Sequence, residues 1–171
     1  MPAARSRAPA SPARERQLVR RGVRLGVDVG AVRIGVASCD RDGLIATPVE
    51  TIRRGKGDLR RIGVLVAEYD AIEIVLGLPR SLDGKEHAAA AHARAFGADL
   101  ARFVAPCPVR LVDERLSTTV AARGMRASGV SSRAARPAID QAAAMVILQD
   151  TLDAERTAGE PPGEVLTVTD E

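Results

Sequence analysis

Three short apolar segments joined by tight turns place the strongest restriction on how this chain folds. Residues 23–29, 32–38 and about 44–52 are rich in Val, Ile, Leu and Ala, and the breaks between them carry Gly30 and Gly43. Connections of two or three residues that contain Gly are typical of β-hairpins. This part of the chain therefore predicts three consecutive antiparallel strands.

The remainder of the chain alternates helix and strand patterns. An apolar strand at about 71–76 follows a helical segment, and a second strand at 109–113 follows an Ala-rich helix. Alternation of this kind indicates crossover units, which place their strands in parallel. The expected fold is α/β, with a mixed five-stranded sheet of three antiparallel and then two parallel strands and helices on both faces. The helices are expected at about 58–69, 85–103, 118–127 and 139–154.

The 171 residues most simply form one domain with a polar segment at each end. Residues 1–24 carry a net charge of +6 and residues 157–171 a net charge of −4, so the middle contributes only +1 to the total of +3. We expect residues 1–22 to be a disordered Arg-rich arm, residues 23–156 to be the folded domain, and residues 157–171 to be a disordered acidic tail.

The composition excludes several kinds of site. Aromatic residues make up 2% of the chain, so the core must be built from aliphatic residues, and a stacking platform for single-stranded bases is not expected. Cys39 and Cys107 are too few and too isolated for a zinc site. No apolar stretch approaches the length of a membrane span, and the N-terminus lacks the apolar region of a signal peptide. We therefore expect a cytoplasmic protein with two free thiols and no membrane partner.

Three carboxylates lie where an α/β fold brings side chains to the same end of its sheet. Asp28 interrupts the first apolar strand, Glu114 follows the strand at 109–113, and Asp140 opens an apolar helix. An ionised carboxylate in such surroundings is costly unless a cation or several donors compensate it. Carboxylates without nearby His or Cys favour Mg²⁺ or Mn²⁺ over zinc. The three acids predict a divalent metal site, and with it a metal-dependent nuclease.

Each acid also has an ordinary structural explanation. Asp28 could serve a hairpin turn, and Glu114 could be a surface acid paired with a neighbouring arginine. Asp140 could stabilise the positive end of its helix. The adjacent Asp113 would point to the opposite face if both acids lie in a strand, so we do not count it as a ligand.

Four motifs follow one another in an order that resembles a known family. Their segments are 25–30 with 33–37, 77–79 with 83–84, 113–118, and 139–148. They resemble the YqgF family, also called RuvX, whose members are described as Holliday-junction resolvases and pre-16S rRNA nucleases. The resemblance covers roughly residues 23–153 and implies a ribonuclease H-like fold, which agrees with the expected strand order.

The resemblance implies that Asp28 bridges two Mg²⁺ or Mn²⁺ ions, while Glu114 and Asp140 each hold one side. Such a site needs no histidine as a general base, and His87 and His92 are five residues apart and do not share a helix face. The residues expected to contact the substrate are Gly30, Arg33, Gly77, Pro79, Arg115, Arg123, Arg126, Arg133 and Arg136. A second basic cluster, which is either a phosphate-binding surface or a solvated one, comprises Arg53, Arg54, Lys56, Arg60 and Arg61.

The implied substrate is structured nucleic acid, either a precursor of small-subunit rRNA or a four-way DNA junction. Cutting a junction would require a homodimer with paired sites, whereas rRNA processing is compatible with a monomer. A noncatalytic RNA-binding factor is the alternative outside catalysis. An actin-like ATPase or sugar kinase is disfavoured, because two domains enclose ATP in those proteins and this chain has the length of one.

Overall fold

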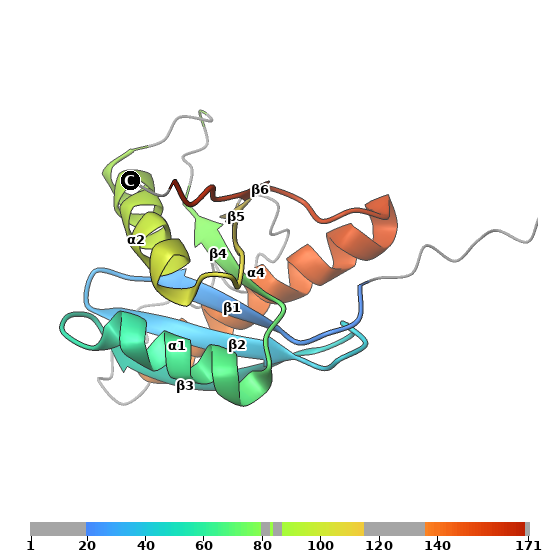
Figure 1. Cartoon of the computed structure of the whole chain (residues 1–171), viewed down its shortest axis with the longest axis horizontal. Helices are drawn as coiled ribbons and strands as arrows, with labels where there is room; N and C mark the ends of the chain where they lie inside the picture. The colour runs from blue at the N-terminus through green and yellow to red at the C-terminus, as the bar shows by residue number, and fades with distance from the viewer. Residues whose placement is uncertain (1–19, 80–82, 84–86, 115–135, 170–171) are drawn as a thin grey trace, which may run out of the picture.

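The computed structural model describes residues 20–79, 83, 87–114 and 136–169, and Figure 1 shows how its helices and strands follow one another. The strands are β1 (Arg24–Val29), β2 (Arg33–Cys39), β3 (Ala46–Arg53), β4 (Glu73–Leu78), β5 (Val109–Asp113) and β6 (Glu164–Val165). The helices are α1 (Asp58–Tyr69), α2 (Ala88–Val104) and α4 (Arg136–Ala158). Helix and strand alternate after the first three strands, as the sequence pattern predicts.

The six strands form one mixed sheet in the order β3-β2-β1-β4-β5-β6. β1 pairs with β2 and β2 with β3 in antiparallel fashion, whereas β1 pairs with β4 and β4 with β5 in parallel. The expected arrangement of three antiparallel and two parallel strands is therefore confirmed. β1 lies inside this sheet, between β2 and β4, so residues at the end of β1 have a neighbouring strand on both sides.

The sixth strand corrects the expected count of five strands and the expectation of a disordered acidic tail at residues 157–171. Glu164 and Val165 pair antiparallel with β5, and Leu166 packs against the main hydrophobic core. The sequence did not predict this strand, because two paired residues and one apolar anchor in an acidic segment are too few to give a periodic pattern. Residues 170–171 and residues 1–19 of the expected arm lie outside the described part of the chain.

Element boundaries differ little from those expected. The helix at 58–69 is confirmed, and it ends at Asp70, which takes a left-handed conformation with φ of 49°. α4 begins before residue 139 and ends after residue 154, so it is longer at both ends than expected. The helix expected at 118–127 lies outside the described residues. Within the described part of the chain, no helix is long and apolar enough to cross a membrane.

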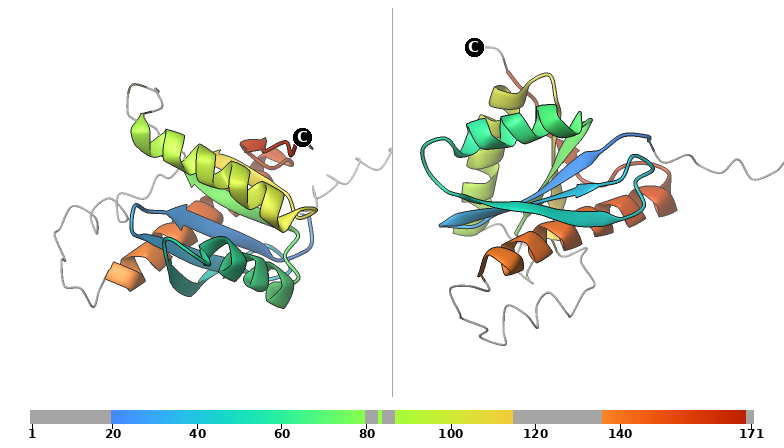
Figure 2. Two further views of the ribbon diagram at one scale, coloured as in Figure 1. Left: turned by 60° about the vertical axis from the view of Figure 1, so that its left-hand side comes forward. Right: turned by 90° about the horizontal axis from the view of Figure 1, so that it is seen from below.

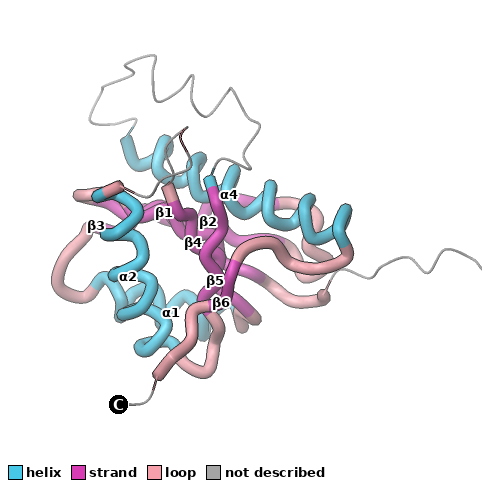
Figure 3. The backbone as a smooth tube through the Cα atoms, turned by 90° about the horizontal axis from the view of Figure 1, so that it is seen from above, coloured by secondary structure: helices cyan, strands magenta, loops and turns pink. Residues whose placement is uncertain are grey.

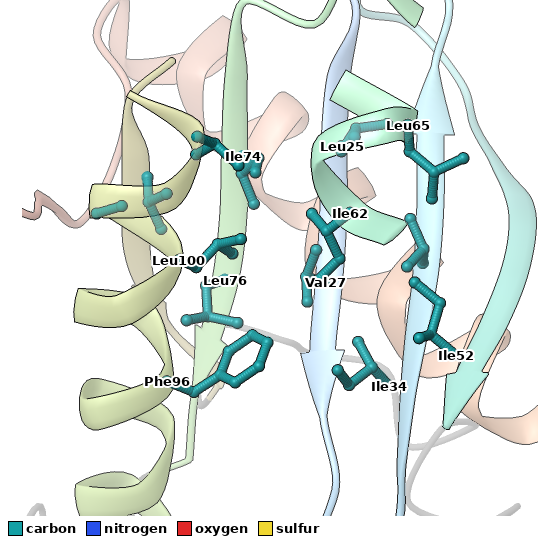
Figure 4. Packing of buried hydrophobic residues seen from close by; sticks show 14 of the residues in the cluster. Leu25, Val27, Ile34, Ile52, Ile62, Leu65, Ile74, Leu76, Phe96 and Leu100 are labelled. Carbon is teal, nitrogen blue, oxygen red and sulfur yellow. The ribbon is translucent and has the colours of Figure 1, made fainter. Parts of the chain in front are cut away.

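The sheet is covered by helices on both faces, which confirms that part of the expected fold. α4 crosses one face, over β1, β2 and β3, and α1 and α2 lie on the other (Figures 2 and 3). The core between the sheet and α1 and α2 is aliphatic apart from Phe96 and the partly buried Tyr69, as the low aromatic content predicts. Figure 4 shows Leu25, Val27 and Ile62 packed in this layer. Each fully buried side chain of this size contributes about 1.5–3 kcal/mol.

The face under α4 is built differently, from small residues that let the helix come close. A Cβ atom placed on Gly26 would lie 2.7 Å from Cβ of Leu148 and 2.8 Å from the backbone oxygen of Ala144. The cluster on this face also contains Ala37 and Val75. We call this side of the sheet the α4 face.

A buried cluster of charges lies where β1 and β4 begin and α4 approaches its end. Arg20 Nε lies 2.8 Å from Glu155 Oε1, and Arg20 Nη2 lies 3.0 Å from Glu73 Oε1. Arg24 Nη2 lies 3.4 Å from Glu155 Oε1, and Arg110 Nε lies 3.1 Å from Glu73 Oε1. Burial by itself would raise the pKa of Glu155, but the hydrogen bond and charge of Arg20, with Arg24, outweigh burial and lower it. Arg20 is thus anchored to the domain, which corrects the expected arm boundary at residue 22.

Candidate functional site

Asp28 and Glu114 lie on the α4 face, where β1 and β5 end. Asp28 is two residues beyond Gly26, which faces α4, and side chains alternate along a strand. Glu114 follows β5, and its side chain lies over Gly77, the glycine of β4 that Ile147 of α4 also covers. Both acids are half-buried. The first two predicted acids are therefore brought to the same end of the same face.

Two glycines flank Asp28 and make room for the other two acids. Gly35 of β2 pairs directly with Asp28. On the other side of β1, Val27 pairs with Leu76 of β4, so Gly77, the next residue of β4, lies beside Asp28. A Cβ on Gly77 would lie 2.9 Å from Glu114 Oε1, and a Cβ on Gly35 would overlap the backbone oxygen of Asp140. The glycines thus allow Glu114 to lie over the strand on one side of Asp28, and the start of α4 to lie over the strand on the other.

Asp140 is held by an arginine at the same end of the sheet. Arg33 Nε donates a hydrogen bond of 2.8 Å to Asp140 Oδ2, and the two side chains are 30% and 23% exposed. Arg33 begins β2 and, two residues before Gly35, shares its face. A guanidinium therefore balances the charge of Asp140 in this structure, although Arg33 was expected to contact the substrate.

The comparisons with known proteins identify the family of the chain. The family model RuvX, described as Holliday junction resolvase, matches residues 22–154, which is most of the chain. This chain belongs to the RuvX family. The resemblance seen in the four motifs is therefore confirmed.

Relatives within the RuvX family cover nearly the whole folded part of the chain. A Streptomyces coelicolor protein named "Putative pre-16S rRNA nuclease" is 59% identical over 152 residues, which are 88% of this chain and 91% of that protein. A protein of the same name from Thermobifida fusca is 56% identical over 159 residues and covers 88% and 99% of the two chains. These proteins match this chain along almost their full length.

A solved structure confirms the ribonuclease H-like fold class. The structure titled "T. thermophilus RuvC in complex with Holliday junction substrate" superposes with a TM-score of 0.53, covering 82% of this chain and 99% of that chain. The two sequences are 16% identical, so the likeness shows the fold alone. It agrees with the strand order of this RuvX chain.

The donor chemistry of the RuvX site fits a hard divalent cation. Asp28, Glu114 and Asp140 offer carboxylate oxygens, which Mg²⁺ and Mn²⁺ prefer. Within the residues that the structure describes, no group of three or more His, Cys, Asp and Glu side chains stands close enough to be a formed metal cage. The three acids share one end of one face, and Arg33 contacts one of them. A cation there would compete with Arg33 for Asp140.

Gly77, Gly30 and Pro79 have structural roles that the sequence only partly indicates. Gly77 supports Glu114, whereas Gly30 shapes the turn between β1 and β2, where its N–H donates a 2.8 Å hydrogen bond to the oxygen of Arg33. A Cβ on Gly30 would meet that same oxygen at 2.7 Å. Pro79 is half-buried directly after β4. Gly30 and Pro79 thus follow directly after β1 and β4 at the same end of the sheet as Asp28 and Glu114.

The predicted basic clusters are only partly described. Arg115, Arg123, Arg126 and Arg133 lie outside the described residues, as does the side chain of Arg136 at the start of α4. In the second basic cluster, which begins at the end of β3, the exposed members are Arg53, Lys56 and Arg60. Arg61 is instead paired with Glu50, with 2.6 Å between Nη2 and Oε1, and this hydrogen bond lowers the pKa of Glu50.

Arg54 occupies a place that the charge pattern does not reveal. Its Nη1 donates a 3.0 Å hydrogen bond to the oxygen of Gly30, and its guanidinium carbon lies 5.0 Å from the centre of the Phe96 ring. With His92, which the sequence analysis set aside, Arg54 lines a pocket beside the end of β1. No periodic or motif signal could have found this pocket, because its lining comes from three separate segments.

Proposed function

We propose that this RuvX-family protein is a divalent-metal-dependent nuclease that hydrolyses phosphodiester bonds of structured nucleic acid, with a precursor of 16S rRNA as its substrate. The observation that carries the proposal is the placement of Asp28 between two glycines, one covered by Glu114 and the other by the start of α4 at Asp140. Relatives named for pre-16S rRNA, at 59% and 56% identity, support the choice of substrate.

Asp28, Glu114 and Asp140 would hold the metal, Mg²⁺ or Mn²⁺. Bound divalent ions at such a site activate water and stabilise the charge that grows on the leaving oxygen. Asp28 lies in β1, where its backbone pairs with Gly35 of β2 and the preceding Val27 pairs with Leu76 of β4. Glu114 and Asp140 come from β5 and α4, so the ligand set depends on the sheet and on the docking of α4. Arg33 orients Asp140 and brings a positive charge to the place where a phosphate would lie.

A Holliday-junction resolvase is the second candidate, because the matching family model carries that description. Both activities use the same chemistry and differ in the substrate and in the number of sites that must act together. Cutting a junction symmetrically requires a homodimer, whereas the rRNA role works with a monomer. We also propose that the protein acts in the cytoplasm.

The test compares the wild type with Asp28→Asn for cleavage of a 16S rRNA precursor fragment and a four-way DNA junction, each with and without Mn²⁺. Loss of supporting ligands alone typically costs 10–100-fold in metal affinity or activity, so loss of Asp28 should lower the cleavage rate by at least about 100-fold. Asp99→Asn, which alters an exposed acid on α2, is the matched control and should cut normally.

The substrate that is cut decides between the two roles. Metal-dependent cutting of the rRNA fragment alone supports the proposal, and cutting of the junction alone supports the resolvase. If neither is cut while both variants bind RNA equally without metal, the protein is a binding factor and the catalytic proposal fails.

A further inference from the structure

A pocket of about 430 Å³ opens next to the proposed catalytic acids, beside the turn between β1 and β2. It falls within the range of about 300–1,000 Å³ that is usual for small-ligand sites. The described residues that line it are Val29, Gly30, Ala31, Arg54, Ala89 and His92. Sites in open α/β sheets commonly lie outside the carboxyl ends of the parallel strands, and this pocket is at that end of β1.

The pocket and the acids lie on opposite sides of the same strand end. Asp28 faces α4, whereas Val29, the next residue, packs against the core on the side of α1 and α2. Two residues of extended chain span at most about 7 Å, so Gly30 is within that reach of Asp28. A chain molecule that crosses the end of the sheet can therefore place one unit at the acids and a neighbouring unit in the pocket.

The lining combines an apolar surface with positive charge. Val29, Ala31 and Ala89 supply aliphatic contacts, and no acidic side chain is among the six described residues that line the pocket. Such a lining suits a ligand with a flat, weakly polar part and an anionic part. A nucleotide has both, in its base and its phosphate.

Arg54 is fixed in place yet keeps donors available. A guanidinium has five N–H donors, and among the described residues Arg54 donates one hydrogen bond, to the oxygen of Gly30. Its Nε lies 3.5 Å from Asp58 Oδ2, and its position over Phe96 holds the plane of the group. His92 is exposed on α2 and adds ring nitrogens to the lining. These groups are positioned to meet a phosphate.

We propose that this pocket binds one nucleotide of the substrate strand, adjacent to the bond that the catalytic acids address. The base lies against Val29, Ala31 and Ala89, and Arg54 with His92 contacts the phosphate. The inference rests on the proposed nuclease function, because it takes the acids to mark the reacting phosphate. The three aliphatic side chains carry no hydrogen-bonding groups, so they contact the base without selecting among bases.

Paired variants test the pocket without unfolding the protein. Ala89 and Ala91 are both exposed near the start of α2, and they are about 200° apart around the helix. Ala89→Glu places a negative charge in the pocket, whereas Ala91→Glu makes the same change in net charge away from it. Arg54→Gln and Arg102→Gln form a second pair, because Arg102 is exposed near the end of α2, lies outside both basic clusters and does not line the pocket.

The measurement is the dissociation constant for a short fluorescein-labelled single-stranded RNA, by fluorescence anisotropy in EDTA, where no metal-dependent cleavage occurs. Burial of one base against the aliphatic side chains is worth enough to change affinity by about fivefold or more. Ala89→Glu and Arg54→Gln should weaken binding by at least that factor, while Ala91→Glu and Arg102→Gln bind within about twofold of the wild type. An abasic strand should bind the wild type more weakly than the normal strand does.

Equal binding by Ala89→Glu and Ala91→Glu would overturn the proposal, and so would equal binding of the abasic and normal strands. Competition with 5′-AMP separates a strand from a free nucleotide. If Ala89→Glu loses only 5′-AMP and keeps its RNA affinity, the pocket serves a free nucleotide and the proposal is wrong. A protein that shows pocket-dependent RNA binding but no cleavage with Mn²⁺ would count against the nuclease function and not against the pocket as an RNA site.

Discussion

Single residues at the end of β1 decide which groups can meet. Gly35 and Gly77 have no side chains to block the approach of Asp140 and Glu114, and Asp28 lies between them. Arg33 then neutralises Asp140 at 2.8 Å. The proposed metal site thus combines three carboxylates with one guanidinium, and on this proposal the balance of charge among them sets the affinity for a cation.

Arg33→Gln tests that balance. The pair is partly exposed, so its loss should lower the free energy of unfolding in EDTA by less than about 1 kcal/mol. Because a positive charge leaves the site, the dissociation constant for Mn²⁺ should fall by at least about threefold, as measured by isothermal titration calorimetry. Arg61→Gln, which removes the partner of Glu50 at β3, is the control and should leave Mn²⁺ affinity unchanged. Unchanged or weaker Mn²⁺ binding by Arg33→Gln would show that the arginine does not compete with the cation.

Among the elements, α4 contributes most to positioning the site. It contacts β1, β2 and β3, and its first turns bring Asp140 over β2. The close approach depends on glycines at Gly26 and Gly35, where a side chain would collide with the helix. The docking distance of α4 is therefore part of the geometry of the site.

Gly35→Ala should push the start of α4 away from the sheet. Overpacking of this kind costs about 1–3 kcal/mol, which chemical denaturation would measure. Cleavage should fall more than the stability loss explains, because Asp140 moves with the helix. Gly63→Ala is the matched control on α1: its new Cβ would meet only the side chain of the exposed Phe103, at 3.0 Å. A helical Gly→Ala change at a permissive position is neutral or stabilising. Normal cleavage by a folded Gly35→Ala would contradict the role given to α4.

Across the whole molecule, the buried charge cluster and the proposed catalytic acids lie at opposite ends of the sheet. β1 begins at Arg24 in the buried charge cluster and ends beside Asp28 and the pocket. Arg20 and Arg24 tie Glu155, near the end of α4, to the start of β1. The same helix therefore meets the anchoring cluster near one end and the acids at the other, and loosening the cluster should loosen the site.

Glu155 should make the stability of the protein sensitive to acid. Its pKa is lowered in the folded state, so its contribution is full above the unfolded value and is lost as the pH falls through the folded value. Glu155→Gln should remove that pH dependence. At neutral pH it should also cost on the order of 3 kcal/mol, since it leaves buried arginine charge unpaired. Urea unfolding at pH 7 and at a series of acidic pH values measures both effects, with the exposed Glu160→Gln as control. Equal acid sensitivity in Glu155→Gln and wild type would contradict this account.

Much of the fold is predictable from the sequence because its helices and strands have clear hydrophobic periods and are bounded by turn residues. The hairpins around Gly30 and the helix at 58–69 follow directly from these local signals. β6 is not predictable in this way, because its two residues depend on β5 for their pairing. Anchoring of Arg20 depends on Glu73 and Glu155, which are distant in the sequence.

The candidate site also has parts that the sequence predicts and parts that only the structure reveals. The sequence places Asp28 and Glu114 at the same end of the sheet, because each lies where an apolar strand ends. Their common face and the contact of Arg33 with Asp140 depend on how the strands pair and how α4 docks. The pocket requires β1, the end of β3 and α2 to be assembled. Contacts between distant segments carry no sequence period, so only the structure reveals them.

The most direct test of the metal centre is a Mn²⁺ titration of Glu114→Gln beside Asp113→Asn. The two acids are adjacent, but only Glu114 covers Gly77 on the α4 face. By isothermal titration calorimetry, Glu114→Gln should weaken Mn²⁺ binding by at least about tenfold, while Asp113→Asn stays within about twofold of the wild type. If Asp113→Asn weakens binding as much, or if Glu114→Gln leaves it unchanged, the acids on the α4 face are not the metal site.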